Sequence, residues 1–583
     1  MDAAVEPDSL RLHSELCELL DYTEGAAQPT GELGRADELL STDQHELAAA
    51  EAEAARQRDA TTETLALIVI SKAKQGLSLH EEANSAANQA LAAERAKTPG
   101  DSRLLGAAAH QQAKALLCTG SADSAQLAAE DALNHYGAVV DYNGQAAVRN
   151  TLARIQLEKE DTLTAMQFCS DARTYFQAQN DIAGEVATMT TQSRIAYMEK
   201  QGANAVYWLD KAQEKLQGET VFRFRLMLLL AEARVTVPGL VAEAAHTAEQ
   251  AADFFRAQGN KLREAWSCLT LAIIYARQGN MTSAKQQAEK AVADLEELRN
   301  LPALATACKV LSWLYACEQS WTSARAQAVL AASTFAEASK PFRQADCLIR
   351  ASRASMGAYH SHIKVAEGNE LKMDDLLQYI EPAQQLAKQA MKIHKEQQDF
   401  LSIGYANALR CLGQALALGG FCREARINLE EALDIYDHRD CNADVAQTLF
   451  ILGEVTFQDG DVNSAVGRWR QARRYYEREG KMPDARYCDE IISLALYGHV
   501  KGNDDRDYSS DGVPFRKFDS GERLQQNVWD PAIGELHALF EQFAARQLKV
   551  LQPKQKEKEP KETISAVRRQ PWAFYISVLP VQV

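Results

Sequence analysis

The stretch Gly279-Asn-Met-Thr-Ser-Ala-Lys-Gln-Gln-Ala-Glu-Lys-Ala-Val-Ala-Asp-Leu295 decides the fold of this chain. Alanine stands at Ala284 and again four and seven residues later, and a large apolar residue, Leu295, follows at eleven. Offsets of 0, 4, 7 and 11 place all four side chains on one face of an α-helix. Because three of them are small, a neighbouring helix can approach this face closely. The glycine five residues before Ala284 suits a left-handed turn that ends a preceding helix.

The same pattern recurs along the chain at a spacing close to 40 residues. The anchor alanines, equivalent to Ala284, are Ala83, Ala125, Ala165, Ala205, Ala244, Ala284, Ala324, Ala383, Ala425 and Ala465. Alanine returns seven residues after every anchor, and eleven residues after it most units carry Tyr, Phe or Leu. Two units depart at that last position, with Glu94 and His394. This repetition excludes coincidence and predicts a chain built from equivalent helices.

Each predicted unit also contains a first helix, helix A, before the anchor helix, helix B. A glycine precedes several anchors by five residues: Gly120, Gly239, Gly279, Gly420 and Gly460. Helix A carries Leu-Gly at Leu412–Gly413 and Leu452–Gly453, and Tyr at Tyr275 and Tyr315. Each unit is therefore predicted to consist of helix A, a tight turn, helix B and a longer polar loop.

Leu-Gly, Tyr, the turn glycine and the paired alanines with a terminal aromatic residue resemble the tetratricopeptide repeat (TPR). The usual unit has about 34 residues and a proline near its end. Units of about 40 residues without that proline resemble the longer subclass seen in kinesin light chains and in bacterial peptide-sensing regulators. The resemblance covers roughly residues 61–497. A HEAT or armadillo array is the structural alternative at this period.

The resemblance implies an all-α fold, a right-handed superhelical α-solenoid of about ten helix pairs over 45–497. Ala324 and Ala383 are 59 residues apart, so an insert of about 19 residues is expected near 358–378, as a surface loop with a short helix or as a partner contact. Residues 1–44 are expected to form an amphipathic helix (10–20) and a linker. We expect a polar linker at 498–529, an amphipathic helix at 530–550, and a charged tether with an apolar end at 551–583.

Composition narrows the functional classes. The 583 residues carry a formal net charge of −17, which disfavours nucleic acid as a partner. Eleven cysteines stand mostly at apolar helical positions without paired spacing, which indicates a reducing compartment. There is neither a signal-peptide pattern nor an apolar run of 18 residues, so the sequence predicts a cytoplasmic protein, or a nuclear one, without a membrane span. The oligomeric state stays open.

In TPR proteins one face of the A helices looks into a concave groove, and the resemblance implies a partner-binding site there. The residues at these positions in this chain are Lys114, Asn150, Arg154, Arg194, Trp266, Leu269, Ile273, Lys309, Trp313 and Arg410. Cations stand at one equivalent position in three successive units, and apolar residues follow. This order suits an acidic peptide with apolar anchors. The alternative is that the cations form a solvated face. Co-chaperones with these repeats grip a carboxylate with Lys and, four residues later, Asn; here Asn150 precedes Arg154, which does not support that clamp.

No catalytic motif, metal-ligand set or cofactor motif is recognisable, so the sequence predicts neither an enzyme nor a bound cofactor. The function it favours is a scaffold or adaptor that holds a partner peptide or helix in the groove, in some larger complex. A ligand-responsive regulator and a structural spacer in a cytoskeletal or organelle assembly are the two alternatives.

Overall fold

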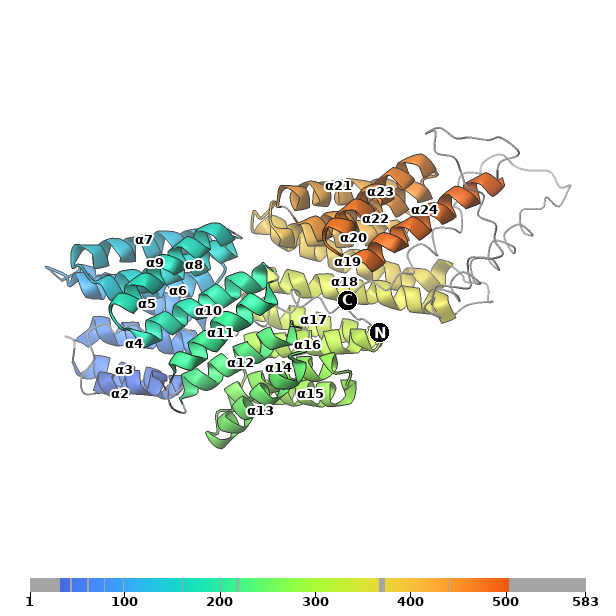
Figure 1. Cartoon of the computed structure of the whole chain (residues 1–583). Helices are drawn as coiled ribbons and strands as arrows, with labels where there is room; N and C mark the ends of the chain where they lie inside the picture. The colour runs from blue at the N-terminus through green and yellow to red at the C-terminus, as the bar shows by residue number, and fades with distance from the viewer. Residues whose placement is uncertain are drawn as a thin grey trace. The chain divides into compact units, whose positions relative to one another are not determined.

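The computed structural model describes residues 32–502, apart from 42–43, 60–61, 78, 98, 160, 200, 217, 219, 238, 366–372 and 440. This part of the chain is helical throughout and forms ten A/B helix pairs (Figure 1). The A helices are α4 (Glu63–Gly76), α6 (Ser102–Cys118), α8 (Tyr142–Glu158), α10 (Ile182–Met198), α12 (Val221–Val235), α14 (Lys261–Arg277), α16 (Leu301–Cys317), α18 (Pro341–Val365), α20 (Ile403–Leu418) and α22 (Asn442–Gln458). The B helices are α5 (His80–Arg95), α7 (Ala122–Ala138), α9 (Thr162–Ala178), α11 (Gly202–Lys215), α13 (Val241–Ala257), α15 (Met281–Glu297), α17 (Trp321–Glu337), α19 (Met373–Glu396), α21 (Cys422–His438) and α23 (Val462–Arg478).

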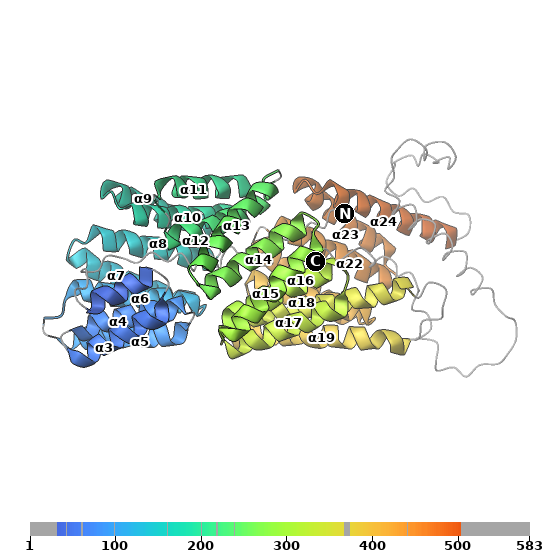
Figure 2. The same ribbon diagram turned by 90° about the horizontal axis from the view of Figure 1, so that it is seen from below.

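Three further helices flank the ten pairs: α2 (Glu32–Ser41) and α3 (His45–Arg58) before them, and α24 (Met482–Gly502) after them. The chain divides into two compact units between Thr448 and Leu449, inside α22. In the first unit, consecutive helices pack on each other along the chain, as the second view shows from α14 to α19 (Figure 2). Several A helices also touch the A helix of the next pair, for example α6 and α8.

The anchor alanines occupy the position that the repeat pattern predicts. All ten have no exposed surface, and neither do the ten alanines that stand seven residues after them. The contact between helices A and B is close enough for a hydroxyl to reach the anchor backbone: Ser71 donates to the carbonyl of Ala83 over 2.6 Å, and Ser312 to that of Ala324 over 2.7 Å. The predicted α-solenoid of TPR-like pairs is confirmed.

The turns follow from glycine at the predicted positions. Gly120, Gly239, Gly279, Gly420 and Gly460 all have φ between 77° and 90°, a region that side chains with a Cβ avoid. After two of these turns the next helix begins at a polar cap: Asn280 accepts a hydrogen bond from the backbone N–H of Ser283 over 3.1 Å, and Asp461 accepts one from that of Ser464 over 3.0 Å.

The two units that lack a large apolar residue at the end of helix B use buried polar groups instead. Glu94 accepts hydrogen bonds from Thr64 Oγ1 (2.7 Å), Lys97 Nζ (2.7 Å) and the backbone N–H of Asp101 (2.8 Å). Burial would raise the pKa of Glu94, but these hydrogen bonds outweigh it and hold the pKa below its usual value.

His394 replaces the large apolar residue in the other unit. Its Nδ1 lies 2.7 Å from the Asp399 carboxylate, which also accepts a hydrogen bond from Ser402. Ser402 in turn caps α20 by accepting from the backbone N–H of Tyr405 over 3.1 Å. In both units a polar side chain ties the end of helix B to the start of the next helix.

Two local expectations differ from the structure. The insert near 358–378 does not form a separate short helix in the described residues; it lengthens α18 and α19 to 25 and 24 residues. Residues 32–41, expected to be linker, form α2, because Leu33, Ala36 and Leu40 share one apolar face that packs with α3 and α4. The predicted helices at 10–20 and 530–550, most of the linker at 498–529 and the segment 551–583 lie outside the described residues.

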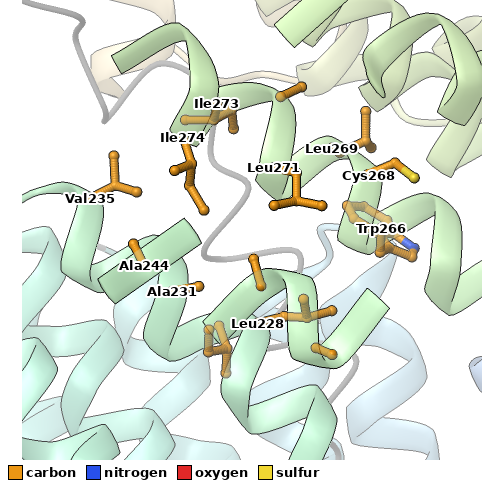
Figure 3. Close-up of a cluster of buried hydrophobic side chains, with 14 of the residues drawn as sticks. Leu228, Ala231, Val235, Ala244, Trp266, Cys268, Leu269, Leu271, Ile273 and Ile274 are labelled. Atoms are coloured by element: carbon orange, nitrogen blue, oxygen red, sulfur yellow. The ribbon is translucent and has the colours of Figure 1, made fainter. Parts of the chain in front are cut away.

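The largest hydrophobic cluster runs continuously from α10 to α16. Figure 3 shows its centre, where Ala231 of α12, Ala244 of α13 and Ile274 of α14 gather between the helices. Cys268 belongs to the same cluster, and burial raises the pKa of its thiol to about 11. A cluster shared by four helix pairs means that no single pair buries its apolar face alone, as stacked repeats require.

Candidate partner-binding face

The predicted groove residues lie on α6, α8, α10, α14, α16 and α20, all within the first unit. We call them the A-helix face: Lys114, Asn150, Arg154, Arg194, Trp266, Leu269, Ile273, Lys309, Trp313 and Arg410. Every one of them is buried, with at most 8% of its surface exposed. The described conformation therefore does not present these side chains to solvent.

The apolar members of the A-helix face belong to the protein core. Trp266, Leu269 and Ile273 lie on α14 in the cluster of Figure 3, and Trp313 of α16 is part of the same cluster. Because these side chains pack between helix pairs, they stabilise the stack whether or not they also touch a partner.

The cations of the A-helix face are engaged within the chain. Arg194 of α10 forms an ion pair with Glu158 at the end of α8. Arg410 of α20 donates to Asp444 over 2.8 Å and to Asn407 Oδ1 over 3.0 Å. Lys114, Arg154 and Lys309 also take part in interactions. Buried charges need such partners, and the ion pairs join neighbouring A helices.

Some polar atoms of the A-helix face nevertheless lack a hydrogen-bond partner within the described part of the chain. Among them are the acceptor Asn150 Oδ1 and the donors Arg194 Nε and Trp313 Nε1. Asn150 is 8% exposed and Trp313 2%, so solvent hardly reaches them. Buried polar atoms in native proteins are almost always paired with protein or with ordered water, so these three atoms are available to a water molecule or to a ligand.

The polar interior of α10 was missed by the sequence analysis. Thirteen consecutive residues, Gly184 to Ala196, are buried, and seven of them are polar: Glu185, Thr188, Thr190, Thr191, Gln192, Ser193 and Arg194. A signal existed, because the run Thr188-Met-Thr-Thr-Gln-Ser-Arg194 interrupts the apolar pattern that the A helices α12, α14 and α16 keep.

The start of α18 contacts helices that precede it by more than 200 residues. Lys340 Nζ donates a hydrogen bond to the carbonyl of Cys118, at the end of α6. The ring of Phe342 stands beside Gly120 in the turn between α6 and α7. We call this contact the α18 latch: Lys340 and Phe342 against Cys118 and Gly120, with Arg343 and His80 near enough to interact electrostatically. It links two distant parts of the first unit and opposes any change in their spacing.

His80 is the titratable group of the latch. Burial lowers its pKa well below the ordinary value, and the charges of Lys340 and Arg343 lower it further. The imidazole is therefore neutral in the latched state at pH 7. A proton added to it would repel Lys340, which precedes α18, and Arg343 on α18, and would weaken the contact.

The described residues contain no cluster of three or more His, Cys, Asp or Glu side chains able to hold a metal ion. Among the described helices, none has the length and apolar character that crossing a bilayer requires.

No protein-family model and no curated protein sequence matches this chain. Solved structures with similar folds include the apo form of the quorum sensor NprR from B. thuringiensis, at 14% identity over 63% of this chain and 96% of that one, with a TM-score of 0.38. A Rap protein complexed with competence and sporulation factor matches at 13% identity over 68% of this chain and 99% of that one, with a TM-score of 0.37. A signal-transduction ATPase with numerous domains from Pyrococcus horikoshii, which carries a tetratricopeptide repeat sensor, matches at 15% identity and a TM-score of 0.39; the match covers 66% of this chain but only 54% of that one.

Proposed function

We propose that this protein is a non-enzymatic scaffold or adaptor that binds a peptide or helix of a partner protein along the A-helix face. The observation that carries the proposal is the set of buried polar atoms without partners on that face, Asn150 Oδ1, Arg194 Nε and Trp313 Nε1. A polypeptide supplies carbonyl acceptors and N–H donors in alternation, which is the mixture that these atoms need.

Charge and packing define the partner further. The face carries five cations, Lys114, Arg154, Arg194, Lys309 and Arg410, in a chain whose net charge is −17. An acidic segment could exchange its carboxylates for the internal partners of these cations, for example Glu158 beside Arg194. Trp266 and Trp313 would supply the large apolar contacts that dominate binding energy at interfaces.

A library of random linear peptides displayed on phage, selected against the immobilised full chain, tests the proposal. We expect enriched sequences that are acidic and carry apolar anchors. Their binding should weaken by about tenfold, the worth of one good hydrogen bond, in Trp313→Phe, which removes the N–H but keeps a ring, and in Asn150→Leu.

Trp208→Phe on α11 is the matched control, because it removes an indole N–H away from the A-helix face. Peptides that bind Trp313→Phe and Asn150→Leu as tightly as the unmodified chain would show that binding occurs elsewhere. A failure to enrich any sequence would favour the structural spacer.

A ligand-responsive regulator is the second candidate, and the α18 latch favours it. A partner that inserts between A helices must change the spacing that the latch holds, so binding and latch opening are coupled. Lys340→Ala should then tighten peptide binding. Weaker or unchanged binding would argue against the coupling.

A further inference from the structure

Helix α23 presents an unusual cationic face in this acidic protein. Its seventeen residues include five arginines and one glutamate, a net charge of +4. Arg470, Arg474 and Arg478 are exposed on one side, spaced four residues apart, and none of them forms an ion pair in the described structure. By contrast Arg473, on the neighbouring side, pairs with Asp489 over 2.7 Å.

The same face of α23 contains a glycine that the fold of the described chain does not require. Gly467 lies in the interior of the helix, is exposed, and a Cβ added there would meet nothing within 4 Å. Glycine destabilises a helix interior relative to alanine. A surface that keeps the backbone open at this point suits the close approach of another chain.

Helix α21 presents the complementary face. It carries five acidic and two basic residues, a net charge of −3. Asp434 and Asp437 are exposed, and neither carboxylate forms an ion pair within the described residues. Ile427 projects from the same side with 59% of its surface exposed.

The two faces match position by position. Ile427 and Gly467 both stand two residues after their anchor alanines, and Asp434 and Arg474 both stand nine after. The protruding side chain and the glycine are therefore each seven residues, about 10.5 Å, from the opposite charges. When α21 lies parallel to α23 and in register with it, a single placement of the two helices puts Ile427 over Gly467 and Asp434 beside Arg474.

We propose that α21 of one copy of this protein docks on α23 of a second copy. Each chain carries one face of each kind, so a single contact between the α21 face of one copy and the α23 face of another is enough to form a dimer. On α21 the protruding Ile427 is seven residues from Asp434, and on α23 the exposed Gly467 is seven residues from Arg474. Because the two spacings are equal and the charges are opposite, a second copy of the chain is the occupant that fits. This inference does not depend on the proposed peptide-binding function.

Sedimentation equilibrium of the full chain, over a roughly hundredfold range of concentration, tests the proposal through mass action. We expect a reversible dimer at neutral pH. The paired variants Arg470→Glu/Arg474→Glu and Asp434→Arg/Asp437→Arg should each raise the dissociation constant by about tenfold or more. Equimolar mixing of the two variants should restore association, because the reversed α23 of one meets the reversed α21 of the other.

Net charge alone cannot produce this pattern. The first variant changes the net charge from −17 to −21 and the second to −13, so general repulsion would make the second associate more tightly. Lys388→Glu/Lys392→Glu is the matched control, because these exposed lysines occupy the equivalent positions of α19. Its association should equal that of the unmodified chain.

Gly467→Leu adds a test in which helix stability rises. The Gly467→Leu variant should melt at the same temperature as the unmodified chain or at a higher one, and yet its copies should associate more weakly. A chain that is monomeric at every concentration, a second variant that associates more tightly, or an α19 control that weakens association equally would each overturn the proposal.

Discussion

Replacing Ala324 by Leu tests the helix contact on which the whole stack depends. Ala324 has no exposed surface, and its carbonyl accepts a hydrogen bond of 2.7 Å from Ser312 on α16. The helices meet at contact distance, so three additional carbon atoms find no room. Overpacking costs about 1–3 kcal/mol, and loss of the Ser312 hydrogen bond about 1 kcal/mol more. We expect the free energy of unfolding to fall by about 2–4 kcal/mol.

Because stability in a stacked array is approximately a sum over neighbouring pairs, the loss should be local. Hydrogen–deuterium exchange should become faster in α16 and α17 and change little in α6, and urea unfolding should give the total. Ala326→Leu is the control, since Ala326 is exposed on the same helix and its replacement should change stability by less than about 0.5 kcal/mol. Equal stability of the two variants, or exchange that rises evenly along the chain, would refute the packing argument.

Three further predictions use the titratable groups. The pKa of His80 is lower in the folded chain than in the unfolded chain, so the stability that His80 contributes is complete above about pH 6.5. Below that pH the free energy of unfolding should fall by up to about 1.4 kcal/mol per pH unit. The variant His80→Gln should flatten this pH dependence of the unfolding free energy. The variant Glu94→Gln weakens three hydrogen bonds to a buried carboxylate and should lower the free energy of unfolding, measured by urea titration, by about 2–3 kcal/mol. The control Glu82→Gln changes an exposed side chain and should change the free energy of unfolding by less than about 0.5 kcal/mol. At pH 8, an iodoacetamide time course followed by mass spectrometry should label the partly exposed Cys422 but not Cys268 until urea unfolds the chain. The reason is that burial raises the pKa of the Cys268 thiol to about 11. Early labelling of Cys268 would contradict the described packing.

The helix pairs were predictable because a steric requirement repeats. Every close contact between helices A and B needs a small residue, so Ala284 and its equivalents mark each contact in the sequence. Glu94 and His394 were recognisable as departures. Their partners were not, because Thr64 lies thirty residues before Glu94 and only the folded chain brings the two together.

The positions of the A-helix face residues could be predicted from the sequence, but their burial and their ion pairs could not. Residues at the same distance from their anchor alanines occupy equivalent places in the stack, so the repeat spacing was enough to identify these positions. Burial and internal pairing depend on how tightly successive pairs wind, which no local pattern encodes. The ion pair between Arg194 and Glu158 joins residues 36 apart, and the α18 latch joins Lys340 to Cys118 across 222 residues.

The internal pairing of the cations changes how binding at the A-helix face should be understood. A partner carboxylate that takes the place of Glu158 beside Arg194 exchanges one ion pair for another, so electrostatics alone adds little affinity. Net affinity must come from the apolar contacts of Trp266 and Trp313 and from atoms that are unsatisfied beforehand, such as Asn150 Oδ1 and Trp313 Nε1. The apparent affinity is reduced further when only a fraction of the molecules has an open face, in proportion to that fraction. Variants that open the α18 latch should therefore change partner affinity more than variants that add charge to the A-helix face.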